Sequence, residues 1–175
     1  NIDGTQMARA TYEGVKQFAY PKRPFIITRS AYSGAQRYSS SWTGDNVASW
    51  EHLWIANIQM QRMSISGMGS TGSDIGGFAE QPSGELYARW IQLGVFHPFC
   101  RTHSSGDHGD QEPWSFDIDV INITRKFVEL RYQLLPYLYT MFWEYINDGV
   151  PMLKPLVYFD QEDPQTHYRT DEFIF

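Results

Sequence analysis

The chain has 175 residues, of which 42% are hydrophobic and 16% aromatic, and its formal net charge is −6 at pH 7. This length suits one domain but is small for a barrel enzyme, and an acidic chain without a basic run is a poor partner for nucleic acid or anionic membrane. No apolar stretch approaches the roughly 20 residues of a membrane span. The single cysteine, Cys100, excludes an internal disulfide and is expected to be a packed thiol. The aromatic surplus is typical of clefts that bind sugars or other rings.

The first elements are a predicted helix and a predicted strand. Residues 7–19 carry a partly apolar stripe at helical spacing, and two prolines follow it. Residues 24–30, PFIITRS, form an apolar β-branched run that predicts a short buried strand. Arg29 lies at the C-terminal end of this run. A guanidinium there needs a carboxylate or a polar ligand, so Arg29 is either half of a structural ion pair or a binding residue.

The segment 37–50, RYSSSWTGDNVASW, contains the strongest candidate for chemistry. Asp45 lies between Gly44 and Asn46, where small residues allow a tight loop between a strand and a helix. A carboxyl group beside the indole of Trp42 is partly withdrawn from water, which suits a general acid. Taken alone, the same aspartate also fits an ordinary loop or helix N-cap.

A second helix and a second polar loop follow this segment. Ser49 is expected to cap a helix over residues 50–64. A glycine-rich stretch then predicts a short strand that leads into the loop GSDIGGF. This loop presents Asp74 and Phe78, so it repeats the pattern of a carboxylate beside an aromatic side chain.

The third unit is a predicted helix over residues 84–93 and a predicted strand over residues 95–104. The strand ends in the polar residues Arg101 and His103. The acidic segment SSGDHGDQEPW comes next. Its histidines and carboxylates lack a regular ligand spacing, so a solvated loop is expected there and no metal site.

A long helix closes the regular part of the sequence. Asp117 or Asp119 is expected to begin it, Pro136 to kink it and Gly149 to supply its C-cap. Beyond Pro151 the sequence becomes proline-punctuated and β-prone, so a domain boundary is expected near that residue. The character of both termini predicts that the chain is a piece of a longer polypeptide.

The order of helices and strands predicts an α/β fold with a parallel sheet or barrel. Each polar group of residues follows a strand and precedes a helix, and in such folds the chemistry lies at the C-terminal ends of the strands. Three short strands cannot close a barrel on their own.

Along nearly its whole length the sequence resembles glycoside hydrolase family 31, the α-glucosidase and α-xylosidase family. The matching pieces, in order, are MARATYEG, RPFIITRSAYSGAQRY, WTGDN, SWEHL, GSDIGGF, ELYARWIQLGVFHPFCRTHS, EPW and LRYQLLPYLYT. The resemblance implies a retaining α-glycosidase, with residues 1–149 forming the C-terminal half of a (β/α)8 TIM barrel. Residues 150–175 would begin a β-sandwich domain.

The resemblance also implies roles for six residues. Asp45, the aspartate of WTGDN, would be the general acid/base. Polar contacts to the hydroxyls of the bound sugar would come from Arg29, Asp74 and His103, and apolar walls from Trp42 and Phe78. These chemistries agree with the residue types, because arginine and carboxylate bind vicinal hydroxyls and aromatic rings cover the C–H face of a sugar.

The family's nucleophile, an aspartate in a WxDMNE-like motif, does not occur in this sequence, and Asp3 does not replace it. Retention needs two carboxyl groups, so we expect the isolated chain to be inactive and its function to belong to a longer parent. An α-linked oligosaccharide and the remainder of the polypeptide are the expected partners, with no cofactor and no metal. A carbohydrate-binding module, an inactive fragment, a transglycosylase and an α-xylosidase remain alternatives.

Overall fold

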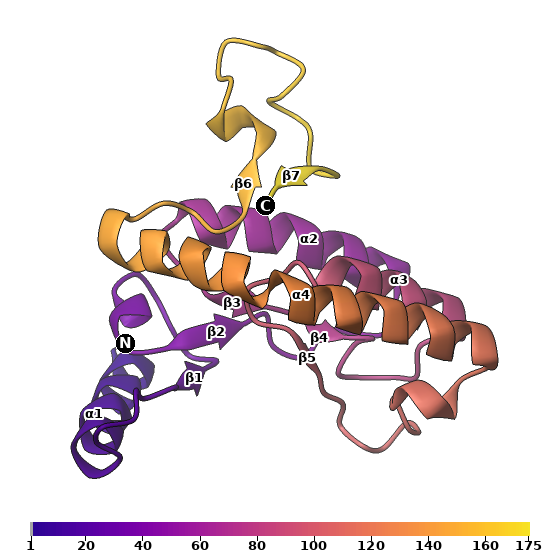
Figure 1. The fold of residues 1–175 in the computed structure, drawn as a ribbon, viewed down its shortest axis with the longest axis horizontal. Helices are drawn as coiled ribbons and strands as arrows, with labels where there is room; N and C mark the ends of the chain where they lie inside the picture. Colours follow the sequence, from indigo (N-terminus) through magenta and orange to yellow (C-terminus); the bar gives the residue numbers. More distant parts are fainter. Residues whose placement is uncertain (1) are drawn as a thin grey trace.

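The computed structural model describes residues 2–175 and has a parallel α/β core followed by a small antiparallel pair (Figure 1). The helices are α1 (Asp3–Phe18), α2 (Trp50–Ile65), α3 (Gly84–Gly94) and α4 (Ile118–Asp148). The strands are β1 (Ile27–Thr28), β2 (Ser40–Trp42), β3 (Thr71–Gly72), β4 (Asp74–Ile75), β5 (Arg101–Thr102), β6 (Lys154–Pro155) and β7 (Phe173–Ile174). Short 3₁₀ turns lie at Ala35–Arg37, Pro113–Ser115 and Leu156–Tyr158.

The first five strands are all parallel to their neighbours. In one sheet β1 pairs with β2 and β2 with β3, and in a second sheet β4 pairs with β5. Only Ser73 separates β3 from β4, so the chain passes directly from the first sheet into the second. The crossovers from β2 to β3 and from β4 to β5 contain α2 and α3. The predicted alternation of strands and helices is therefore present, and β2 is a strand that the sequence analysis did not separate from the Asp45 loop.

The helices α2, α3 and α4 begin at residues whose side chains cap them, and α4 also ends at a glycine cap. At the start of α2 the Ser49 hydroxyl accepts a hydrogen bond from the backbone N–H of His52. At the start of α3 the Ser83 hydroxyl accepts one from the backbone N–H of Leu86. Asp117, one of the two predicted starts of the long helix, accepts from the backbone N–H of Val120 at 2.9 Å. Gly149 ends that helix in the left-handed conformation, with φ 73°, which glycine adopts without a steric penalty.

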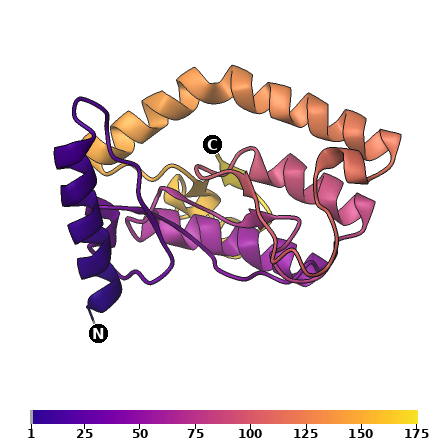
Figure 2. The same ribbon diagram turned by 90° about the horizontal axis from the view of Figure 1, so that it is seen from below.

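The long helix α4 packs on α3 and stays continuous through Pro136 (Figure 2). Proline has no N–H to donate to the preceding turn. Figure 2 shows α4 as a smooth arch over the rest of the molecule. The proline is thus accommodated by curvature spread along the helix rather than by a break.

The core lies where α3 packs between β4 and the other helices. Trp90 of α3 is fully buried, and its indole Nε1 donates to the hydroxyl of Ser73 at 3.0 Å, which satisfies the one polar atom of the ring. The buried cluster consists of Ala56, Ile75, Leu86, Tyr87, Trp90, Ile91, Val95 and Val120. These residues come from α2, from α3 and its C-cap Val95, from β4 and from α4, so the core fixes the strand that carries Asp74 against three helices.

Two predicted strands are shorter than the sequence suggested. The strand predicted over residues 95–104 was wrong for its first part, because residues 95–99 turn and only Arg101–Thr102 pairs with β4. Carbonyl groups of this turn bind the guanidinium of Arg131 instead of a neighbouring strand. In the strand predicted over residues 24–30, only Ile27–Thr28 pairs, and Phe25 is 67% exposed. That strand is not buried, because only β2 pairs with it among residues 2–175.

One side of α4 leaves a continuous apolar surface in contact with solvent. We call it the α4 stripe. Its members recur every three or four residues, the spacing of a single helix face, and are Val128, Tyr132, Leu135, Tyr139, Trp143 and Ile146. An apolar face of this extent is typical of a surface that packs against further protein. Within residues 2–175 no helix is both long and apolar enough to cross a lipid bilayer.

His97 is a fully buried imidazole in the turn before β5. Neither of its ring nitrogens has a hydrogen-bond partner among residues 2–175. Burial, together with the nearby positive charge of Arg131, lowers the pKa of His97 to about 3. The side chain is therefore neutral throughout the physiological range, and protonating it requires the turn to open.

We expect the intact protein to lose stability as the pH falls from about 6.5 toward 3. In this window the unfolded chain takes up a proton at His97 and the folded chain does not. The free energy of unfolding therefore falls by up to about 1.4 kcal/mol per pH unit for this one group. Urea unfolding at several pH values would measure this slope. In His97→Leu the slope of the unfolding free energy against pH should be smaller by up to about 1.4 kcal/mol per pH unit, the effect of one proton. Equal slopes in the two proteins would contradict the assignment.

Candidate active site

The polar residues singled out from the sequence gather at the C-terminal ends of the parallel strands. Arg29 directly follows β1, Asp45 lies in the loop after β2, Phe78 lies in the loop after β4, and His103 directly follows β5. Asp74 begins β4 itself. Because neighbouring parallel strands end at the same edge, four separate loops contribute side chains to one region.

The loop after β2 brings Asp45 against Arg29. One terminal nitrogen of Arg29, Nη1, lies 3.1 Å from Asp45 Oδ2. Gly44 has φ 83°, and a Cβ atom there would lie 3.1 Å from Arg29 Nε, so glycine both permits the turn and makes room for the guanidinium. Both partners remain about half exposed. The carboxylate is therefore oriented by a cation yet open to a ligand.

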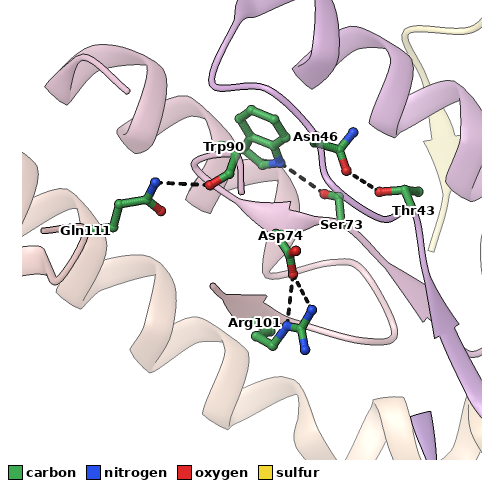
Figure 3. A network of polar contacts seen from close by, with 8 residues as sticks. Thr43, Asn46, Ser73, Asp74, Trp90, Arg101 and Gln111 are labelled. Carbon is green, nitrogen blue, oxygen red and sulfur yellow. Dashed lines mark hydrogen bonds and ion pairs between the residues drawn. The ribbon is translucent and has the colours of Figure 1, made fainter. Parts of the chain in front are cut away.

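Asn46 joins this loop to the loop after β4. The backbone carbonyl oxygen of Asn46 accepts hydrogen bonds from the backbone N–H groups of Phe78, at 2.7 Å, and Ala79, at 3.0 Å. Its buried side chain accepts from the hydroxyl of Thr43 (Figure 3). Hydrogen bonds to Asn46 thus connect the backbone around Asp45 to the backbone around Phe78.

Gly77 makes this close approach possible. It has φ 90°, and a Cβ atom there would lie 2.6 Å from Ala48 Cα, a backbone atom that cannot move aside. On the other side, the side-chain amide of Gln111 donates to the Gly77 carbonyl at 3.0 Å. Gly77 is therefore required by packing as well as by the turn.

Asp74 is completely buried and forms an ion pair with Arg101, its register partner on β5 (Figure 3). Asp74 Oδ1 accepts from Arg101 Nε at 2.9 Å and from Nη2 at 2.6 Å. Asp74 Oδ2 is buried and has no partner among residues 2–175. Burial raises the pKa of Asp74, against the opposing effect of Arg101. One oxygen is thus committed to the strand pair, and the other is enclosed in the fold without a hydrogen-bond partner among residues 2–175.

Aromatic rings border the charged groups. The Cζ atom of Arg101 lies 5.1 Å from the ring centroid of Trp42, within the range of a cation–π contact. The rings of Phe78 and His103 are 5.3 Å apart. The structure thus brings the polar candidates and the two predicted aromatic walls into the same region.

The sequence analysis did not include Arg101 in its set of site residues. The available signal was its place in RTH, two residues before His103. Within a strand, residues two apart point to the same face. Which carboxylate Arg101 would meet depends on the register between β4 and β5, and register cannot be derived from strands this short.

The arrangement is suited to acid/base and hydroxyl-binding chemistry. No group of three or more histidine, cysteine, aspartate or glutamate side chains within residues 2–175 could hold a metal ion. What the site offers is an accessible carboxylate beside a cation, a buried carboxylate with one free oxygen, an exposed imidazole and aromatic faces.

A profile of the glycosyl hydrolases family 31 TIM-barrel domain matches residues 1–141. The chain belongs to glycosyl hydrolase family 31. Alpha-glucosidase 2 of Bacillus thermoamyloliquefaciens is 42% identical over 174 residues, which cover 99% of this chain and 22% of that protein. Glucosidase 2 subunit alpha of Saccharomyces cerevisiae is 41% identical and is matched over 100% of this chain and 19% of its own length.

Solved structures of family 31 enzymes show the same fold. The crystal structure of a family 31 alpha-glucosidase from Bacteroides thetaiotaomicron has a TM-score of 0.95 and 37% identity, covering 99% of this chain and 30% of that one. A Flavobacterium johnsoniae family 31 dextranase complexed with glucose has a TM-score of 0.86 and 32% identity, with 99% and 22% covered. The chain spans about a fifth of the length of the curated family 31 relatives described above.

Proposed function

We propose that this chain is the acid/base-bearing part of a retaining α-glucosidase that removes terminal α-linked glucose from oligosaccharides. The observation that carries the proposal is the Arg29–Asp45 pair, an accessible carboxylate held at the ends of parallel strands in a family 31 chain. The relatives support the choice of sugar, because two of them are named as glucosidases and share 42% and 41% of their aligned residues with this chain.

In the proposed mechanism Asp45 acts in both steps of a double displacement. It first protonates the glycosidic oxygen as the bond to the anomeric carbon breaks. It then removes a proton from the water that hydrolyses the covalent glycosyl–enzyme intermediate. Arg29 orients the carboxyl group and balances the negative charge that Asp45 takes on after giving up its proton. The loop after β5 can bind sugar hydroxyls through His103, with Trp42 and Phe78 as apolar walls. Asp74 is fully buried, so in this conformation it acts on the site through its ion pair with Arg101 and not by direct contact with the sugar.

The nucleophile of this mechanism is assigned to another part of the parent polypeptide. A retaining enzyme needs a second carboxyl group roughly 5–5.5 Å from the acid/base. Asp74 does not fit this role, because it is fully buried and bonded to Arg101. We therefore assign only one of the two catalytic carboxyl groups to this chain.

The exposed parts of the fold support a place within a larger barrel. We assign residues 1–149 to the later strands and helices of a (β/α)8 barrel and residues 150–175 to the beginning of a β-sandwich domain. Within residues 2–175, β1 pairs only with β2 and β5 only with β4, which leaves one edge of each strand unpaired. The α4 stripe is likewise uncovered. A barrel pairs every strand edge, so further strands and helices of the parent would cover these surfaces.

The test compares the intact parent with the isolated chain on maltose and on an aryl α-glucoside. We expect the parent to release glucose whose first-formed anomer is α, as observed by NMR, and the isolated chain to release none. A β-anomer as first product would contradict retention, and activity of the isolated chain would contradict the assigned position of the nucleophile. Transfer of glucose to another sugar instead of water would identify a transglycosylase, and preference for an aryl α-xyloside would identify an α-xylosidase.

A further inference from the structure

The proposed mechanism gives no role to the motif LRYQLLPYLYT, although its arginine makes three hydrogen bonds to the turn before β5. Arg131, on α4, donates from Nη1 to the carbonyl of Val95 at 2.7 Å and to the carbonyl of His97 at 2.6 Å. From Nη2 it donates to the carbonyl of Pro98 at 2.9 Å. A single side chain thus binds three of four consecutive carbonyl groups.

This arrangement requires a guanidinium. Three carbonyl oxygens in different directions need several N–H donors in a fixed planar fork, which arginine has and lysine lacks. None of the ion pairs within residues 2–175 includes Arg131. The groups facing the cation are backbone carbonyl dipoles, with His97 and Cys100 as the nearest titratable side chains. Arg131 is half-buried, and withdrawing even part of a cation from water without a carboxylate costs free energy.

The segment held by Arg131 leads directly into the site. Phe99 donates its backbone N–H to the carbonyl of Thr71 at 3.1 Å, and its own carbonyl lies against Gly72, where a Cβ atom would come within 1.8 Å of it. Two residues further on, Arg101 pairs with Asp74. The position of the turn along the strands therefore determines which atoms of Arg101 and Asp74 meet.

We propose that Arg131 is a positioning residue for the active site, and that its hold on residues 95–98 sets the register of β5 and thereby the Arg101–Asp74 pair. Arg131 contacts no substrate itself. It acts from α4 through the backbone of the turn. This inference rests on the proposed glucosidase function, because its effect is measured as a change in that activity.

The test uses Arg131→Lys in the intact parent, with Arg125→Lys as the matched control. Arg125 lies on the same helix, is exposed and is replaced in the same way. Lysine keeps the charge but loses the fork, so kcat/KM on maltose should fall about 10–50-fold, since small misplacements of binding groups cost factors of this size. The control should stay within about twofold of the wild type.

A double-mutant cycle separates positioning from general destabilisation. In an Arg101→Lys background the pair with Asp74 is already disturbed, so Arg131→Lys should lower kcat/KM less than about threefold further. A loss of the same factor in both backgrounds would overturn the proposal, because effects that do not pass through Arg101 add independently. So would wild-type kinetics of the single variant.

Hydrogen exchange keeps the test independent of the assigned activity. In Arg131→Lys the amide of Phe99 should exchange at least about tenfold faster, while the amide of Ala88 in α3 stays unchanged. If the parent does not hydrolyse α-glucosides, the proposed function is wrong. The exchange rates alone then decide whether Arg131 holds residues 95–98 in place. If both Arg131→Lys and Arg131→Gln fail to fold, Arg131 is a general stabilising residue and the positioning proposal is overturned.

Discussion

Asp45→Ala in the intact parent should slow the hydrolysis of disaccharides by about 10²–10⁴-fold, the usual contribution of a general acid. An unactivated sugar oxygen is a poor leaving group and must be protonated as the bond breaks. A nitrophenolate leaves without that help, so formation of the glycosyl–enzyme from an aryl α-glucoside should be affected far less. The rates of the variant on both substrate classes measure this difference, with Asp107→Ala, another exposed loop aspartate, as the matched control.

Azide should then restore turnover of Asp45→Ala on the activated substrate. The covalent intermediate accumulates because water lacks its base, and azide, an anion, needs none. The product should be a glycosyl azide of retained anomeric configuration, identified by NMR. Equal losses on both substrate classes without azide rescue would make Asp45 a loop aspartate rather than the acid/base.

Asp74 should give the second large effect, and its two simplest variants should differ. Asp74→Asn keeps an oxygen that accepts from Arg101 and should lose less kcat/KM than Asp74→Ala, for which we expect about 10²–10³-fold. Removing the carboxylate also leaves Arg101, a partly buried cation, without its partner. Asp74→Ala should therefore lower the free energy of unfolding by about 3 kcal/mol, the range seen when one partner of a buried pair is removed.

Kinetics and urea unfolding of the two Asp74 variants are the measurements. Equal losses of activity in two variants that both remain folded would show that the charge of Asp74 matters and its hydrogen bonds do not. A wild-type unfolding midpoint for Asp74→Ala would show that the ion pair adds nothing to stability.

Local chemistry explains what could be predicted from the sequence. Caps such as Ser49 and Asp117 act within three residues, so their signal is contained in the sequence next to them. The position of Asp45 in a loop between strand and helix follows from the small residues around it in the same way. The family motifs then predict that five further residues lie in the same region as Asp45.

The contacts that escaped prediction are those between distant parts of the chain. Arg131 binds carbonyl groups more than thirty residues away, and no local pattern in LRYQLLPYLYT indicates the turn that it holds. The ion pair of Arg101 with Asp74 depends on strand register in the same way. Residues 95–99 resembled a strand because their apolar character fits one, yet Pro98 lacks an N–H for a ladder and the free carbonyls bind a side chain instead.

The two hydrogen bonds accepted by the backbone carbonyl of Asn46 limit how the sugar preference of the proposed glucosidase can be redesigned. An insertion or deletion in the loop that carries Phe78 would pull on Asn46 and so displace Asp45, its neighbour in sequence. Selectivity and rate would then change together, and a library built at residues 76–80 would return mostly inactive variants. Residues 106–109 are all exposed and are the better place for diversity, because changes there leave the bonds of Asn46 intact.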